Sequence, residues 1–194
     1  MDHLLKWYVR LRYPQYRKAY RLTFYPDGFH HYPFELKAHL KGLSKDALVT
    51  SLRRDLATYA VPGMEGELTH TLEALAEGIL ALPNTLDCIT ELITTGRISR
   101  RSKMILLAIV AYLVSPVDVI PEGALRGAGY ADDVIFASIA LNEIVLASER
   151  EEIAEVWGAH LAHLEHLYAV ASFARENLAE LHKQVVTMYK RIFI

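Results

Sequence analysis

Four acidic side chains flanking one short loop are the strongest candidates for chemistry in this sequence: Asp118, Glu122, Asp132 and Asp133. If the loop brings them to one face, their carboxylates form an oxygen-only ligand set, which suits Mg²⁺ or Ca²⁺. A metal-dependent hydrolase at this loop is therefore one hypothesis. Each carboxylate also has a structural role available, because turns and helix N-termini present backbone N–H groups to such side chains. The structural role is favoured, and no cofactor is expected.

Basic side chains gather in two stretches that could contact an anionic surface. Arg97, Arg100, Arg101 and Lys103 precede an apolar run, and the N-terminal segment contains Arg10, Arg17 and Arg21. Residues 1–41 hold eight lysines and arginines and three acidic residues, although the whole chain has a net charge of −2. Aromatic residues accompany the N-terminal arginines, which suits either packing within the protein or a helix at an anionic membrane. Without a recognition motif, nucleic acid is not expected as a partner.

Other catalytic signatures are absent from the sequence. It contains no phosphate-binding glycine loop after a strand and no Gly-x-Ser-x-Gly nucleophile motif. The single cysteine, Cys88, has apolar neighbours in a predicted helix, so we expect a buried, inert thiol. These observations favour a protein that is not an enzyme.

A specific pattern surrounds the acidic loop. An apolar helix ends in Ser-Pro-(aliphatic)-Asp-(aliphatic)-Ile-Pro, and Gly-Tyr-(aliphatic)-Asp-Asp begins a second apolar helix. The residues that carry the pattern are Ser115, Pro116, Asp118, Ile120, Pro121, Gly129, Tyr130, Asp132 and Asp133. Over residues 103–142 the chain resembles the YkvA-like family, a domain of unknown function (number 1232), although Glu122 replaces the usual aspartate. The resemblance implies a helical hairpin and brings no established activity.

Turn and capping signals predict an all-α helical bundle with an apolar helix-loop-helix hairpin. Ser44 is expected to begin a helix that ends near residue 60, and Pro83 is expected to end the next helix. Apolar helices are predicted at 103–114 and 132–147. The apolar run 104–114 spans about 17 Å, which is too short to cross a hydrocarbon core of roughly 30 Å.

The last segment, 148–194, has the most regular apolar pattern. Ser148 and Glu151 fit a capping box, and apolar residues follow at heptad spacing. The pattern predicts one helix of roughly 45 residues and roughly 65 Å, which must pack against a partner along its length. We expect self-association through a heptad seam that includes Trp157, Leu164, Leu167, Leu178, Leu181, Val185 and Met188.

These features divide the chain into a basic aromatic segment (1–43), a helical bundle (44–147) that contains the hairpin (103–147), and the C-terminal helix (148–194). Charged residues interrupt the N-terminus, so a signal peptide is not predicted and a cytoplasmic location is expected. The leading hypothesis is a non-enzymatic interaction or scaffold protein that forms a homo-oligomer or binds a protein partner. The alternative is a peripheral protein at the inner face of the membrane, which would bind through residues 97–147 and the basic N-terminus.

Overall fold

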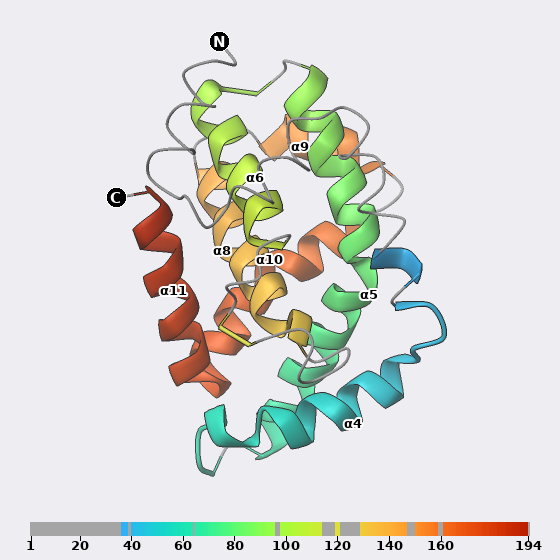
Figure 1. Cartoon of the computed structure of the whole chain (residues 1–194), viewed down its shortest axis with the longest axis vertical. Helices are drawn as coiled ribbons and strands as arrows, with labels where there is room; N and C mark the ends of the chain where they lie inside the picture. The colour runs from blue at the N-terminus through green and yellow to red at the C-terminus, as the bar shows by residue number, and fades with distance from the viewer. Residues whose placement is uncertain are drawn as a thin grey trace.

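The computed structural model describes residues 36–38, 40–63, 65–95, 98–113, 119–120, 129–146, 150–158 and 161–193. Every regular element in these ranges is helical, which confirms the predicted all-α bundle. The elements shown in Figure 1 are α4 (Lys45–Asp55), the 3-10 turn η2 (Ala57–Tyr59), α5 (Glu65–Thr95), α6 (Arg100–Leu113), α8 (Ala131–Leu146), α9 (Arg150–Trp157), α10 (Leu161–Asn177) and α11 (Ala179–Phe193).

Helix α4 begins as its sequence predicts and lies across one end of the bundle (Figure 1). The Ser44 hydroxyl accepts a hydrogen bond from the Ala47 backbone N–H at 3.2 Å, which caps the first turn. The helix ends at Asp55, and the remaining residues of the predicted helix form the tighter turn η2. Leu48 and Leu52 lie on the buried face of α4 and pack into the core.

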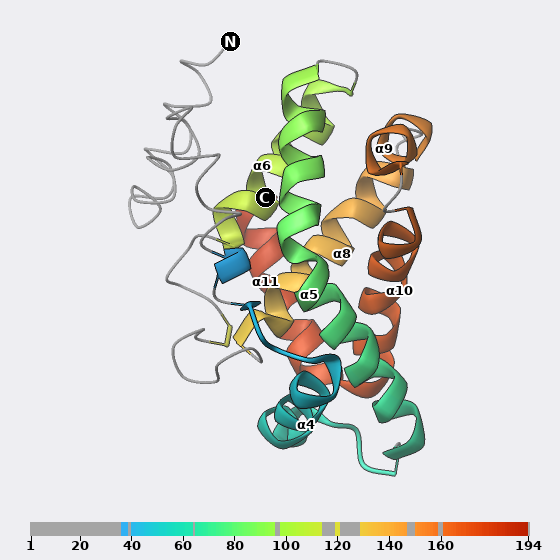
Figure 2. The same ribbon diagram turned by 90° about the vertical axis from the view of Figure 1, so that its right-hand side faces the viewer.

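Helix α5 corrects the prediction that Pro83 ends a helix. It runs from Glu65 to Thr95 with Pro83 inside it, and its ribbon changes direction about halfway along (Figure 2). Proline lacks the N–H that bonds to the carbonyl four residues earlier, which costs about 3 kcal/mol in a helix interior. Burial of apolar side chains on both sides of Pro83, such as Leu82 and Leu86, offsets that cost.

Helix α8 is the central element of the bundle. It contacts α5, α6, α9, α10 and α11, and its residues 131–138 are all buried. Figure 2 shows it between α5 and α10. The predicted hairpin is present, because α6 and α8 pack against each other. An apolar helix of this kind is stable only when neighbours cover it on every side.

The expectation of one long C-terminal helix is wrong, because residues 150–193 form α9, α10 and α11. Helix α9 ends at Trp157, and Gly158 adopts a positive φ of 43°, which is the left-handed conformation typical of a helix end. Helix α10 ends at Asn177, whose carbonyl accepts a hydrogen bond from the Val61 N–H at 3.0 Å. The Asn177 amide also donates to the Thr71 hydroxyl at 2.9 Å.

The predicted heptad seam is consequently used within this chain. Its residues Trp157, Leu164, Leu167, Leu178, Leu181 and Val185 are at most 1% exposed, and Met188 packs on the core at partial burial. Helix α10 packs on α5 and α8, while α11 packs on α8 and α10. The same apolar core includes Leu36, Leu48 and Leu75, so residues predicted to form separate regions are buried together.

Helices α5 and α8 approach each other closely at a glycine. A Cβ atom added at Gly78 would lie 2.5 Å from Cγ1 of the buried Val134, well inside van der Waals contact. Gly66, in the first turn of the same helix, has no atom within 4 Å of its added Cβ. The lack of a side chain at Gly78 therefore sets the distance between the two helices.

We predict that Gly78→Ala destabilises the protein by about 1–3 kcal/mol, because the new methyl group overpacks the core. Gly66→Ala is the matched control, and it should be neutral or stabilising by up to about 1 kcal/mol through helix propensity. Urea unfolding followed by circular dichroism measures both free energies of unfolding. Val134→Ala in the Gly78→Ala background should recover part of the loss, and equal stability of the two single variants would contradict the close approach.

Candidate functional site

The candidate site is the point where the end of α6, residues 119–120 and the start of α8 meet around Asp132. The Oδ2 atom of Asp132 accepts hydrogen bonds from the Tyr112 hydroxyl at 2.8 Å, the Val119 N–H at 2.9 Å and the Ile120 N–H at 3.1 Å. The Val119 N–H also contacts the Tyr112 hydroxyl, at 3.3 Å. One carboxylate oxygen therefore joins α6, residues 119–120 and α8.

Asp132 is fully buried, which shapes its electrostatics. Burial raises the pKa of its carboxyl, while the hydrogen bonds from Tyr112 and the backbone oppose that rise. Burial also raises the pKa of the Tyr112 hydroxyl, and the nearby carboxylate adds to the effect, so this group stays a hydrogen-bond donor. Asp133 is likewise buried in the first turn of α8, where the positive end of the helix dipole favours carboxylates.

Aromatic rings extend this site into the core. The Tyr112 ring stacks on Phe136 of α8 with centroids 4.3 Å apart and planes 4° apart. Phe136 meets Tyr189 of α11 edge to face at 5.4 Å. The Tyr189 hydroxyl donates to Glu143 Oε2, and Glu143 Oε1 accepts from Arg101 Nη2 at 2.6 Å. This series of contacts begins at Tyr112, near the end of α6, and leads through α8 and α11 to Arg101, near the start of α6.

Helices α8 and α10 are joined by further polar contacts, which the sequence patterns did not predict. The Ser138 hydroxyl donates to the Leu167 carbonyl and accepts the Ala171 N–H at 2.9 Å. In a regular helix the Ala171 N–H would donate to the Leu167 carbonyl four residues earlier. The Ser138 hydroxyl lies between these two groups and bonds to both. The Asn142 amide donates to the Tyr168 carbonyl of α10 at 2.9 Å. The presence of Ser138 and Asn142 in an otherwise apolar helix is the sequence feature that could have predicted these contacts.

The acidic set predicted to hold a metal is only partly described by the structure. Asp132 and Asp133 lie at the start of α8, whereas Asp118 and Glu122 fall outside the described residues. Within the described ranges, no three histidine, cysteine, aspartate or glutamate side chains converge on a metal position. The bonds to Asp132 Oδ2 support the structural role, and the Mg²⁺ or Ca²⁺ hypothesis stays a prediction.

The predicted basic surface is described at the start of α6. Arg100 and Arg101 are exposed and Lys103 is half-buried, while Arg97, Arg10, Arg17 and Arg21 lie outside the described residues. Ser99 caps this helix end, because its hydroxyl accepts the Ser102 N–H at 3.1 Å. None of the helices in the described ranges is long and apolar enough to span a membrane.

Cys88 has the environment expected from the sequence. Cys88 is 7% exposed on α5, and burial raises the pKa of its thiol to about 11, with Asp87 and Glu91 adding to the rise. At neutral pH this group is a thiol and not a thiolate, so it lacks the reactivity of a nucleophile.

We predict that Asp132→Ala destabilises the protein by about 3 kcal/mol, because it leaves buried N–H and hydroxyl donors without their acceptor. Tyr112→Phe keeps the stacked ring and removes one hydrogen bond, so it should cost about 1 kcal/mol. Asp87→Ala, which removes an exposed carboxylate from α5, is the control and should change stability by less than about 0.5 kcal/mol. Chemical unfolding measures all three, and an Asp132→Ala cost equal to that of Asp87→Ala would exclude the anchoring role.

The raised pKa of Asp132 also predicts a pH dependence. The folded protein binds this proton more tightly than the unfolded chain, so the contribution of Asp132 is fully present below pH 3.8 and declines as pH rises through the folded pKa. Asp132→Asn cannot ionise and lacks this slope. The stability difference between wild type and Asp132→Asn should therefore favour wild type most near pH 4 and shrink towards pH 7. A constant difference in urea unfolding across that interval would contradict the raised pKa.

The sequence of the hairpin is similar to one protein family. No curated protein and no solved structure matches the chain. Residues 102–139, which comprise most of α6, the loop and the first half of α8, match the model of one family. That family is described as "Protein of unknown function (DUF1232)", as the motif around Asp132 and Asp133 predicted.

Proposed function

We propose that this protein is a non-enzymatic helical module that docks on an anionic membrane surface through the first turn of α6. The observation that carries the proposal is the charge of that turn. It contains Arg100, Arg101 and Lys103 and no acidic residue. Helices α8, α9 and α11 each have acidic residues in their first turns.

Cations at a helix N-terminus are electrostatically unfavourable. The helix dipole places about half a positive charge at that end, so each cation there costs about 0.3–1 kcal/mol. Residues that break a local rule without a compensating contact in the fold are typical of functional surfaces. The dipole and the side chains both attract an anion at the start of α6, and a headgroup phosphate or carboxylate has the required charge.

One face of α6 continues this surface with apolar residues. Arg100, Lys103, Met104, Leu107 and Ala111 follow helical spacing, and all are exposed or half-buried, whereas the opposite face is buried. Cations beside partly exposed apolar side chains are the composition of helices that lie at a membrane interface. This face supports docking of α6 along the surface, with its basic end at the headgroups.

Arg101 has a different role from its neighbours. Its guanidinium bonds to Glu143 of α8 at 2.6 Å, so it holds the two helices of the hairpin together. Arg100 and Lys103 have no ion pair within the part of the chain that the structure describes, and they are the residues assigned to docking. Self-association through the heptad residues is not part of the proposal, because those side chains form the core of their own chain.

We predict that Arg100→Glu combined with Lys103→Glu releases the protein from phosphatidylserine vesicles and also stabilises its fold. Each basic residue near an anionic membrane contributes about 1 kcal/mol, so reversing two charges should weaken binding by more than about tenfold. The same changes should add about 0.6–2 kcal/mol to the free energy of unfolding, because acidic side chains suit a helix N-terminus. Vesicle co-sedimentation and thermal unfolding measure the two effects.

The control variant combines Arg175→Glu with Lys183→Glu, which reverses two exposed charges on α10 and α11. It has the same net charge as the test variant, so a general effect of charge would weaken the binding of both equally. Vesicles of phosphatidylcholine alone should retain neither protein. Unchanged binding of the Arg100 and Lys103 variant to phosphatidylserine vesicles would refute docking through α6.

A further inference from the structure

A groove of about 470 Å³ lies between residues 37–38 and 40–41 on one side and the bend of α5 on the other. We propose that this groove binds a small anionic amphiphile, a molecule with one alkyl chain and a carboxylate or phosphate head. The groove belongs to a different part of the fold from the first turn of α6, and its ligand is independent of the docking proposed above. Its volume lies within the range of about 300–1,000 Å³ that is usual for small-molecule sites.

Four of the seven residues that line the groove are apolar. Leu40, Leu80 and Pro83 line it together with Ala38. Pro83 is where α5 lacks a backbone N–H and bends, so the groove occurs where the regular helix surface is interrupted. Apolar side chains around a concave space favour an alkyl chain over a polar ligand, since its transfer from water contributes about 0.8 kcal/mol per CH₂ group.

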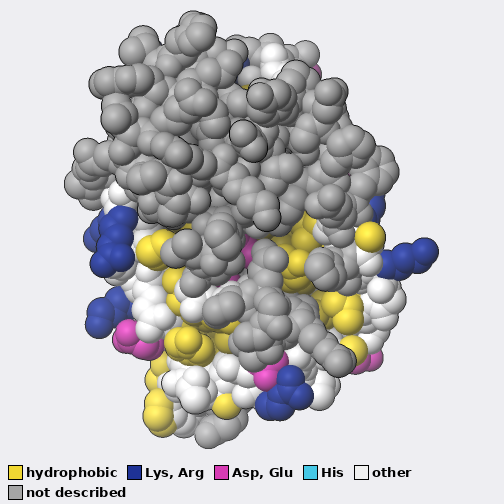
Figure 3. Space-filling view, viewed as in Figure 1, with side chains coloured by type: hydrophobic (Ala, Val, Ile, Leu, Met, Phe, Trp, Pro, Cys, Tyr) yellow, Lys and Arg dark blue, Asp and Glu magenta, His cyan; other side chains and the backbone are white. Residues whose placement is uncertain are grey.

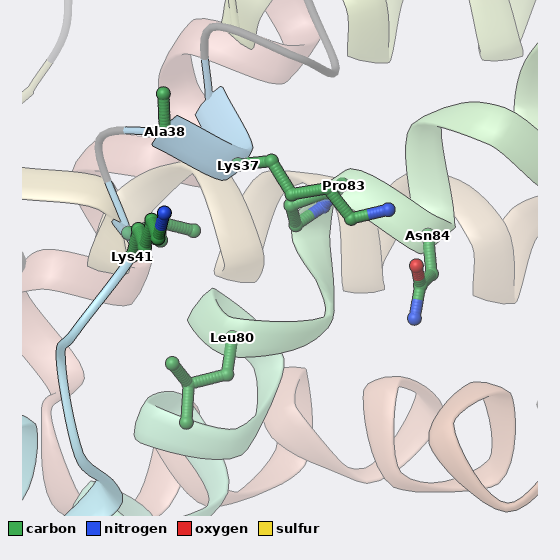
Figure 4. A pocket seen from close by; sticks show the side chains of 7 residues that line it. Lys37, Ala38, Lys41, Leu80, Pro83 and Asn84 are labelled. Atoms are coloured by element: carbon green, nitrogen blue, oxygen red, sulfur yellow. The ribbon is translucent and has the colours of Figure 1, made fainter.

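The charged residues that line the groove are both lysines. Lys37 extends from the segment 36–38 across Pro83, and Lys41 and Asn84 lie at opposite sides of the view in Figure 4. Neither lysine has an ion pair with any residue that the structure describes, and no carboxylate is among the lining residues. Lysine ammonium groups beside apolar lining residues favour a ligand with an anionic head over one with a cationic head.

The surface around the groove has the same mixed character. On the right-hand side of Figure 3, where Figure 1 places the segment 36–38 beside α5, apolar side chains reach the surface next to lysine and arginine side chains. Lys37 and Lys41 are exposed, so each can swing over a bound head group. The alkyl chain would lie along Leu40, Leu80 and Pro83.

The test is isothermal titration calorimetry of the full-length protein with octanoate and with octyl phosphate. These probes share the chain and differ in the head, so they distinguish a fatty acid from an alkyl phosphate as the ligand class. Octanol, which has the chain without the charge, and inorganic phosphate, which has the charge without the chain, should each bind at least about tenfold more weakly. Absence of binding by both octanoate and octyl phosphate would overturn the proposal.

Two variants locate the bound probe. Lys37→Ala combined with Lys41→Ala removes the head-group contacts and should weaken binding by at least about tenfold. Ala38→Trp places a large side chain at the exposed edge of the groove and should block the alkyl chain to a similar degree. Arg53→Ala, which removes an exposed cation from α4, is the control and should leave binding unchanged.

If both groove variants bind the probes as wild type does, the groove is not the binding site and the proposal is wrong. The Arg100→Glu and Lys103→Glu variant should bind octanoate or octyl phosphate normally, because those residues lie outside the groove. Loss of vesicle binding therefore tests only the docking through α6, and loss of probe binding tests only the groove.

Discussion

Helix α8 is apolar on nearly every side, so its burial requires neighbouring helices all around it. That requirement arranges α5, α6, α9, α10 and α11 about one axis. The polar side chains of α8 must then find partners inside the bundle, because an unsatisfied buried group costs about 1–3 kcal/mol. Ser138 and Asn142 bind the backbone of α10, and Glu143 binds Arg101 of α6 and Tyr189 of α11. Each polar residue thereby specifies which neighbour covers which side of the helix.

Asp132 performs the same task at the first turn of α8. By accepting hydrogen bonds from the Tyr112 hydroxyl and from the backbone N–H groups of Val119 and Ile120, it holds α6 and residues 119–120 against the start of α8. The stacked ring of Phe136 holds Tyr112 in place. The structure therefore gives Asp132, one acidic residue of the motif, a structural role. A buried carboxylate that accepts several hydrogen bonds is costly to remove, because its donors lose their partner.

Two local features oppose the usual preferences of a helix, and each lies at a surface proposed above to bind a ligand. The first turn of α6 places cations at the positive end of its dipole, and α5 contains Pro83 in its interior. The packing of α5 and α6 into the core offsets the free-energy cost of each feature. The first creates a strongly positive helix end beside partly apolar residues, and the second opens a groove beneath Lys37 and Lys41. The proposed membrane docking and the proposed amphiphile site rest on these two departures.

The sequence alone determined the elements whose signals are local: the Ser44 cap, the apolar hairpin and the apolar face of residues 150–193. Tertiary structure decided what covers that face. Heptad spacing shows which side chains avoid water, but a second copy and this chain's own helices bury them equally well. The turn at Asn177 depends on Val61 and Thr71, and the continuity of α5 through Pro83 depends on core packing. Such contacts join residues far apart in sequence, so their energies outweigh local propensity without appearing in any local pattern.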